Sequence, residues 1–250
     1  MIADRAHWRG WEAEYIRQES VDVDRNLRLY EALYVQARQM GVFSAADLLE
    51  GVPRKTRLAR CFMFRDLLEK MAKAFEARSI AYMVIGGQAA LLYGEPRLTA
   101  DVDVTVGIAP EGLPVVLEAV RALGWQVLVE DAEAFVRRTM VLPCREEASG
   151  IRIDIVFSQS AYEQEALRRV RRVPFGATEV CFASPEYVII HEVIAGRPRD
   201  IEDCRRIWLK NPHLDEGYIR HWLQQFEDAL GEPFLSRLEQ VRQIDGGEIR

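Results

Sequence analysis

The chain has 250 residues, of which 49% are hydrophobic and 29% are charged, so it can bury the core of one large domain or two smaller ones. This composition excludes a wholly disordered chain, and the longest apolar runs are too short to cross a membrane. A net charge of −6 argues against broad, non-specific binding of nucleic acid, although it leaves room for a local basic groove.

The cysteines and the first residues indicate the cellular compartment. Four cysteines lie far apart and form no C-x-x-C pair, so they predict neither a zinc site nor a disulfide framework. Residues 1–5 lack a basic region followed by an apolar core, so we expect no secretory signal. The sequence therefore predicts a reduced, cytoplasmic protein. The four cysteines are Cys61, Cys144, Cys181 and Cys204.

The expected elements divide the chain into three regions. Residues 1–78 carry helical patterns, with an amphipathic run at 62–75. Residues 79–185 alternate strand and helix signals, and residues 186–250 are helical again. The sequence thus predicts an α/β (α+β) fold, in which a mixed sheet flanked by helices carries helical extensions at both ends.

The order of elements follows from hydrophobic periodicity and from Gly and Pro breaks. In the middle region we expect strands at 80–85, 101–106, 125–129, 134–142 and 151–157, helices at 88–93 and 110–123, and a last short strand beginning at 181. In the final region we expect helices at 187–195, 201–209, 216–229 and 233–244.

Two aspartates lie two residues apart on the strand expected at 101–106. Because strand side chains alternate between faces, Asp101 and Asp103 point to the same side. Carboxylates held this close repel each other, and a divalent cation with a preference for oxygen, Mg²⁺ or Mn²⁺, removes the repulsion. The alternative is a surface strand ion-paired to Arg97 or Arg137, although the intervening valines predict that the opposite face is buried.

Two further elements extend this candidate site. Gly86-Gly87-Gln88 lies between a strand and a helix, where glycines either let backbone N–H groups approach a phosphate or serve packing alone. Asp154 stands among apolar residues of a later strand, where a carboxylate is costly unless it pairs with an arginine or binds a metal.

These motifs resemble those of the polymerase-beta-like nucleotidyltransferase superfamily: a Gly-Gly turn, then Arg97-x-Thr99-x-Asp101-x-Asp103, then a third carboxylate on a later strand. The resemblance implies that Asp101, Asp103 and Asp154 are catalytic and hold two divalent metals, Mg²⁺ or Mn²⁺, with an NTP as substrate. It implies nucleotide contacts from Gly86, Gly87, Gln88, Arg97, Thr99, Arg197 and Arg199.

The segment 188–203 resembles one particular branch of this superfamily. Its Ala-Gly-Arg-x-Arg-Asp-x-x-Asp run looks like the C-terminal signature of the abortive-infection branch, which contains toxins of toxin–antitoxin systems. Relatives usually carry a lysine four residues before this glycine, where the chain has Glu192, whose charge repels phosphate. Arg197 and Arg199 either replace the lysine or form a helix-capping salt-bridge network with Asp200.

Two other features have two interpretations each. Arg168, Arg169, Arg171 and Arg172 form a basic cluster, which is either a solvated helix end or an edge that contacts phosphates. His191 is either a general base or a packed or partly exposed residue, and its mostly apolar helix favours the second interpretation.

The sequence therefore predicts a metal-dependent nucleotidyltransferase that moves a nucleoside monophosphate from an NTP to a hydroxyl of RNA, protein or a small molecule. The expected partners are a nucleotide and, by resemblance alone, RNA or an antitoxin protein. One alternative is a weak or inactive module of the same fold that binds nucleotide, nucleic acid or a partner protein, which Glu192 favours. Another is an oligomeric scaffold in which Trp8 and Trp11 anchor a partner.

Overall fold

A computed structural model describes residues 13–18, 21–39, 63–95, 101–158 and 160–243. Contacts divide the chain into two compact units, and the division falls within the helix that starts at Gly86. We call them the sheet unit (24–89 and 96–183) and the helical unit (1–23, 90–95 and 184–250). The three regions expected from composition stay a prediction.

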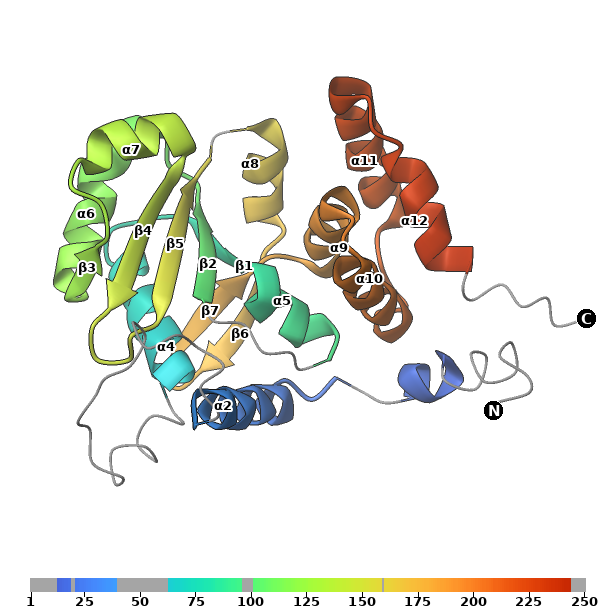
Figure 1. The fold of residues 1–250 in the computed structure, drawn as a ribbon, viewed down its shortest axis with the longest axis horizontal. Coiled ribbons are helices and arrows are strands. Elements are labelled where there is room, and N and C mark those ends of the chain that lie inside the picture. The colour runs from blue at the N-terminus through green and yellow to red at the C-terminus, as the bar shows by residue number, and fades with distance from the viewer. Residues whose placement is uncertain (1–12, 19–20, 40–62, 96–100, 159, 244–250) are drawn as a thin grey trace, which may run out of the picture. The chain divides into compact units, whose positions relative to one another are not determined.

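The sheet unit contains a seven-stranded mixed sheet, which confirms the predicted α/β class (Figure 1). The strand order is β3-β4-β5-β2-β1-β7-β6. The strands are β1 (Tyr82–Ile85), β2 (Asp101–Val106), β3 (Trp125–Val127), β4 (Val141–Glu146), β5 (Arg152–Phe157), β6 (Arg171–Phe175) and β7 (Thr178–Phe182). The accompanying helices are α2 (Val23–Gln39), α4 (Met63–Glu76), α5 (Gly86–Tyr93), η3 (Pro110–Gly112), α6 (Leu113–Ala122), α7 (Ala132–Thr139) and α8 (Ala161–Arg168).

The middle of the sheet has one apolar face. Strand β2 runs parallel to β5 and antiparallel to β1, so that Val104 pairs with Ile155 and with Val84. These three side chains are fully buried. On the same face, Tyr82 of β1 packs edge-on against Phe75 of α4, with ring centroids 5.3 Å apart. Helix α4 therefore packs on the valine face at β1, and the aspartates of β2 lie on the opposite face.

One predicted strand is wrong. Residues 134–142 divide between helix α7 and the start of β4. The helix begins at a good cap, because the Asp131 carboxylate accepts a hydrogen bond of 2.9 Å from the Ala134 backbone N–H. An i,i+4 ion pair of 2.8 Å between Glu133 and Arg137 lies on its exposed side. Met140, at φ 61°, then ends the helix in the left-handed region.

The last strand of the sheet also differs from the expectation. Strand β7 ends at Phe182, whereas we expected a strand to begin at Cys181. It forms an antiparallel hairpin with β6, an edge strand that the sequence analysis missed. The basic residues Arg171 and Arg172 had concealed its alternating pattern, in which Val173 and Phe175 are buried.

The helical unit contains the four helices expected in the last region, with bounds that differ by a few residues from the prediction. Ser184 and Asp215 cap two of them by accepting hydrogen bonds from backbone N–H groups two to three residues inside the helix. One helix ends at Gly196, at φ 64°, where the Arg237 guanidinium donates to the Val193 carbonyl at 2.8 Å. The helices are α9 (Pro185–Ala195), α10 (Pro198–Lys210), α11 (Glu216–Leu230) and α12 (Phe234–Gln243).

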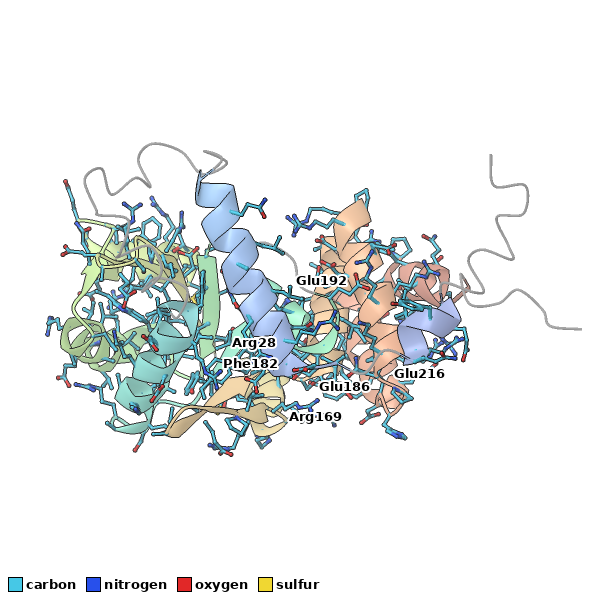
Figure 2. All side chains as sticks on the ribbon, turned by 90° about the horizontal axis from the view of Figure 1, so that it is seen from below. Arg28, Arg169, Phe182, Glu186, Glu192 and Glu216 are labelled. Atoms are coloured by element: carbon cyan, nitrogen blue, oxygen red, sulfur yellow. The ribbon has the colours of Figure 1, made fainter. Side chains whose placement is uncertain are left out.

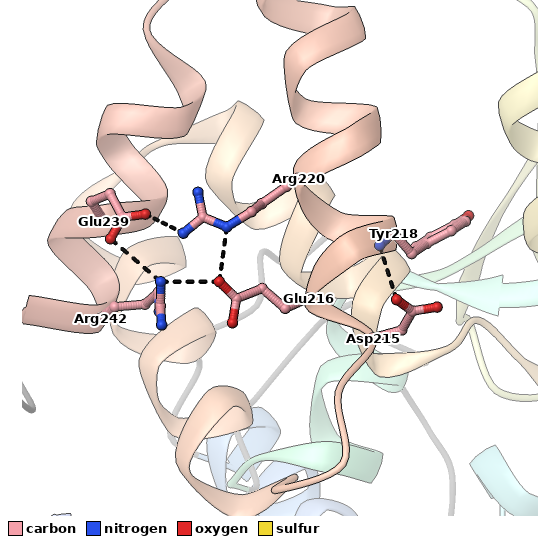
Figure 3. A network of polar contacts seen from close by, with 6 residues as sticks. All are labelled: Asp215, Glu216, Tyr218, Arg220, Glu239 and Arg242. Carbon is pink, nitrogen blue, oxygen red and sulfur yellow. Dashed lines mark hydrogen bonds and ion pairs between the residues drawn. The ribbon is translucent and has the colours of Figure 1, made fainter.

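A ring of ion pairs connects α11 and α12 (Figure 3). Glu216 lies 2.8 Å from Arg220 and 3.0 Å from Arg242. Glu239 pairs with the same two arginines, at 3.5 Å from Arg242. Each carboxylate of this ring thus stands between two guanidinium groups, and positive and negative charges alternate around it.

Some sequence expectations concern other parts of the chain. Trp8, Trp11, Arg97 and Thr99 lie outside the described residues. Among the helices that are described, none is long and apolar enough to cross a membrane.

Candidate metal centre

Three aspartates converge on the polar face of the sheet. Strands β2 and β5 are parallel neighbours, and their register places Asp103 directly opposite Asp154. Asp101 lies two residues earlier on β2 and therefore on the same face. One carboxylate oxygen from each aspartate lies within 4.8 Å of the others, and all three residues are half-buried. The register thus assembles the carboxylates that the sequence analysis had selected separately.

The converging oxygens fit a divalent cation. Mg²⁺ takes oxygen ligands at about 2.1 Å, so two oxygens on opposite sides of the ion are about 4.2 Å apart. Neighbouring ligands of one ion lie about 3 Å apart, so the three oxygens, which lie within 4.8 Å of one another, are close enough to share a cation once they move toward it. Because the three aspartates are only half-buried, one side of the site is open to solvent. Water or a phosphate oxygen could complete the coordination of a cation from that side. The three candidate ligands are all carboxylate oxygens, which suit cations such as Mg²⁺ or Mn²⁺ better than metals that prefer nitrogen or sulfur.

Cys144 does not join these ligands. It lies on β4 opposite Ile153, and therefore on the apolar face of the sheet. Burial first, and then the negative charge of Asp154, raises the pKa of its thiol to about 12. The thiol stays protonated at neutral pH and is a poor metal ligand, so the ligand set is made of oxygen alone.

Gly86 allows the chain to pass close to Asp103. It is the first residue of α5 and has φ +62°, a conformation that residues with a side chain rarely adopt. A Cβ atom at this position would lie 2.5 Å from Oδ2 of Asp103, closer than any real contact. The strand-to-helix turn therefore packs against a carboxylate of the site, and the phosphate contact expected from Gly86 and Gly87 stays a prediction. Gln88, two residues after Gly86, is buried.

Arg152 is the charged neighbour that the sequence analysis did not select for the site. Its Nε donates a 3.0 Å hydrogen bond to Oδ1 of Asp154, two residues along β5. This bond, followed by the charges of Asp154, Asp101 and Asp103, raises the pKa of Arg152 against the opposing effect of burial. The alternative for Asp154 was a salt bridge across the sheet with an arginine; the observed partner is an arginine, but it lies on the same strand, and the Arg152-x-Asp154 spacing was the signal that could have pointed to it.

The arginines expected from the C-terminal signature lie in the helical unit. Arg197 caps α10, because its Nε donates to Oδ2 of Asp200 at 2.6 Å and its backbone N–H donates to the same oxygen at 3.3 Å. This is the helix-capping alternative, and it uses the Arg197 side chain. Arg199 is exposed, and Glu192 is buried on α9 (Figure 2). Their predicted effects on nucleotide binding stay predictions.

Two other candidate features, His191 and the basic cluster, lie away from the three aspartates in the sequence. The His191 ring stacks on Tyr187 of the same helix, with ring centroids 4.2 Å apart, but the side chain as a whole is exposed, so His191 lies on the surface of α9 and not in its packed face. The basic cluster divides between two elements, since Arg168 ends α8 and Arg171 begins the edge strand β6. Arg172, also on β6, lies 4.0 Å from Glu179.

No protein-family model and no curated protein matches the sequence. Solved structures with a similar fold include an antigenic nucleotidyltransferase-like protein from Paracoccidioides brasiliensis, at 15% identity over 70% of this chain and 91% of that chain, with a TM-score of 0.45. They include the antibiotic-resistance factor ANT(2'')-Ia, at 16% identity over 72% of this chain and 97% of that chain, with a TM-score of 0.47.

A CCA-adding enzyme from Thermotoga maritima, solved with tRNA, is also similar, at 16% identity and a TM-score of 0.32. The match covers 80% of this chain and 53% of that enzyme. With such low identities, the assignment of a function depends on this chain's own carboxylates. The fold and the site define a class, a mixed α/β protein with three converging aspartates on adjacent parallel strands.

Proposed function

We propose that the chain is a metal-dependent nucleotidyltransferase, which moves a nucleoside monophosphate from an NTP to a hydroxyl acceptor. The observation that carries the proposal is the convergence of Asp101, Asp103 and Asp154 within 4.8 Å on one face of the sheet. A protein gains little stability from three carboxylates that face one another, because their charges repel. A site of this kind is therefore better suited to a cation and its phosphate ligands than to structural support.

The roles of the aspartates follow from their places on the strands. Asp101 and Asp103 share one strand and one face, so they hold the cation together from one side. A divalent cation bound there supplies positive charge to the triphosphate and to the attacking oxygen. Asp154 lies opposite Asp103 and takes the proton of the acceptor hydroxyl. The acceptor oxygen then bonds to the α-phosphorus as the bond from that phosphorus to the pyrophosphate oxygen breaks.

The nucleotide contacts form the second part of the proposal. Contacts to a phosphate are proposed from backbone N–H groups at the start of α5, as at other helix N-termini. Other contacts are proposed from Gln88, Arg97, Thr99, Arg197 and Arg199. An RNA acceptor, an antitoxin partner and a cytoplasmic location rest on the sequence resemblance and composition alone.

A second candidate function is a binding module of the same fold without turnover. Two observations favour it: the Arg197 side chain is engaged by Asp200, and a buried glutamate, Glu192, stands where relatives usually carry a lysine. Such a module would bind a nucleotide without transferring it. The two candidates therefore differ in transfer activity.

The experiment is an incorporation assay with each of the four labelled NTPs and Mg²⁺ or Mn²⁺, with total RNA, with a protein mixture and without added acceptor. We expect label on an acceptor with the wild type and with Asp66→Asn, a matched control for an exposed aspartate on α4. We expect none with Asp103→Asn. Equal labelling by Asp103→Asn would contradict the proposed mechanism. Nucleotide binding by calorimetry without any labelling would favour the binding module.

A further inference from the structure

Arg152 stands beside the three aspartates because of the strand register. It lies directly opposite Asp101 on the neighbouring strand and two residues before Asp154 on its own strand. Side chains opposite each other, and side chains two residues apart, share a face of a sheet. The guanidinium group is therefore on the polar face, next to the carboxylates and not behind them.

The contact of Arg152 competes with a cation. Its Nε donates to Oδ1 of Asp154 at 3.0 Å, so one lone pair of a proposed metal ligand is already used. The positive guanidinium also lowers the local negative potential that attracts a divalent cation. A cation that binds all three aspartates must therefore share Asp154 with Arg152 or replace it.

The side chain of Arg152 has room to move. It is 53% exposed, whereas Asp154 is 17% exposed, so the guanidinium group lies at the solvent side of the pair. An exposed ion pair of this kind is weak and exchanges readily. The planar guanidinium group matches phosphate oxygens as well as it matches a carboxylate.

We propose that Arg152 is an exchanging counter-ion: it holds Asp154 while the site lacks a cation, and it transfers to the triphosphate when metal and nucleotide bind. The inference rests on the proposed function and adds a triphosphate-binding residue to it. Arg152 then links the two binding events, since the triphosphate offers the guanidinium a new anionic partner when the cation takes Asp154. A fixed structural ion pair would instead remain in place and support the geometry of Asp154.

An exchanging counter-ion and a fixed structural ion pair predict opposite effects of Arg152 on metal binding. The test is a titration of the full chain with Mn²⁺ alone, in which electron paramagnetic resonance measures free Mn²⁺. Loss of the competing charge in Arg152→Gln should tighten Mn²⁺ binding by about fivefold, the upper range for a half-exposed ion pair. Arg152→Lys keeps the charge and should bind Mn²⁺ as the wild type does. Arg137→Gln, which removes an exposed arginine paired to Glu133, is the matched control and should have no effect.

The second readout is the KM for NTP. Because the guanidinium group would contact the triphosphate, Arg152→Gln should raise this KM by about tenfold while it tightens Mn²⁺ binding, and Arg152→Lys should restore part of the loss. Local damage to the strand would not strengthen metal binding. Unchanged or weaker Mn²⁺ binding by Arg152→Gln, or an unchanged KM, would overturn the inference.

Failure of this inference can be told apart from failure of the proposed function. If only the inference is wrong, Mn²⁺ binds to the wild type, is lost in Asp103→Asn, and is unchanged or weakened in Arg152→Gln. If the metal site itself is wrong, Asp103→Asn binds Mn²⁺ as the wild type does, and Arg152→Gln has no effect either. Circular dichroism of each variant confirms that it is folded.

Discussion

Among the residues that the structure describes, the acidic side chains of the α11–α12 ring and those of the three aspartates are arranged in opposite ways. In the helical unit, Glu216 and Glu239 alternate with Arg220 and Arg242, so that each carboxylate contacts two guanidinium groups (Figure 3). In the sheet unit, three aspartates direct oxygens toward one another within 4.8 Å, and Arg152 contacts one of them from the solvent side.

This difference in charge arrangement indicates that the α11–α12 ring supports the fold, whereas the three aspartates are suited to bind a ligand. Alternating charges satisfy each other, so the α11–α12 ring contributes modestly to stability and attracts no cation. Converging carboxylates repel each other, and a cation between them relieves the repulsion.

The largest effect is expected on nucleotide transfer. Asp101→Asn keeps the size of the side chain and removes a ligand charge, so it should lower the transfer rate by more than about hundredfold, beyond the usual cost of losing an outer partner of a metal ligand. Glu239→Gln removes a carboxylate from the ring and should leave the rate unchanged. Equal losses in the two variants would show that the clusters do not differ in function.

The next effect is on thermal stability in the presence of Mn²⁺. A cation at about 100 times its dissociation constant stabilises the folded state by about 2.7 kcal/mol, so the wild type should melt several degrees higher with Mn²⁺ than with EDTA. Glu216→Gln should show the same shift, because the ring holds no cation. Asp101→Asn should show little or none. Scanning calorimetry in both buffers makes the comparison, and a full shift in Asp101→Asn would count against the site.

A smaller effect is expected from Gly86→Ala. The new Cβ atom would lie 2.5 Å from Oδ2 of Asp103 and must displace that carboxylate. Gly124→Ala is the matched control, because Gly124 has a similar φ of +68° and a Cβ atom added there would meet nothing within 4 Å. Both variants should lose about 1–2 kcal/mol of stability through the left-handed backbone. Only Gly86→Ala should also lose Mn²⁺ affinity, by about tenfold, and equal Mn²⁺ affinities would remove the steric link to Asp103.

The smallest effect is the pH dependence of the ring. The hydrogen bond from Arg220 lowers the pKa of Glu239 below its ordinary value of 4.5. A lowered folded-state pKa contributes stability above the unfolded value, and this contribution is lost as the pH falls through the folded value. Because Glu239 is 38% exposed, solvent screening limits it to a few tenths of a kcal/mol. The difference in melting temperature between the wild type and Glu239→Gln should therefore begin to shrink below pH 4.5 and disappear once the pH has fallen through the lower folded-state pKa, and a difference that grew in acid would contradict the assignment.

Local periodicity was sufficient to predict part of the site. The alternation in Asp101-Val102-Asp103-Val104 predicted one polar and one apolar face, and the burial of both valines confirms the apolar one. The meeting of Asp103 with Asp154 was not available from periodicity, because the two residues are 51 positions apart and the strand register fixes their pairing. Only the resemblance to a known family placed them together in advance.

The wrong strand at 134–142 and the omission of Arg152 from the candidate site also have physical causes. Residues 134–142 read as a strand because Ala134, Phe135 and Val136 form a short apolar run, and such a run does not distinguish strand from helix. The cap at Asp131 and the Glu133–Arg137 pair carried the helical signal. The Arg152-x-Asp154 spacing placed both side chains on one face in advance, but Arg152 was not selected for the site because alternation alone does not specify the hydrogen bond between them.

The proposed metal site is tested most directly by crystallising the chain with Mn²⁺ and measuring the anomalous scattering of the crystal. If the aspartates bind the cation, an anomalous peak should lie about 2.1 Å from carboxylate oxygens of Asp101, Asp103 and Asp154, which is the ligand distance of Mg²⁺. No peak should lie at the α11–α12 ring. An empty triad with Arg152 still bonded to Asp154, in a crystal whose Mn²⁺ lies elsewhere, would contradict the proposed metal site.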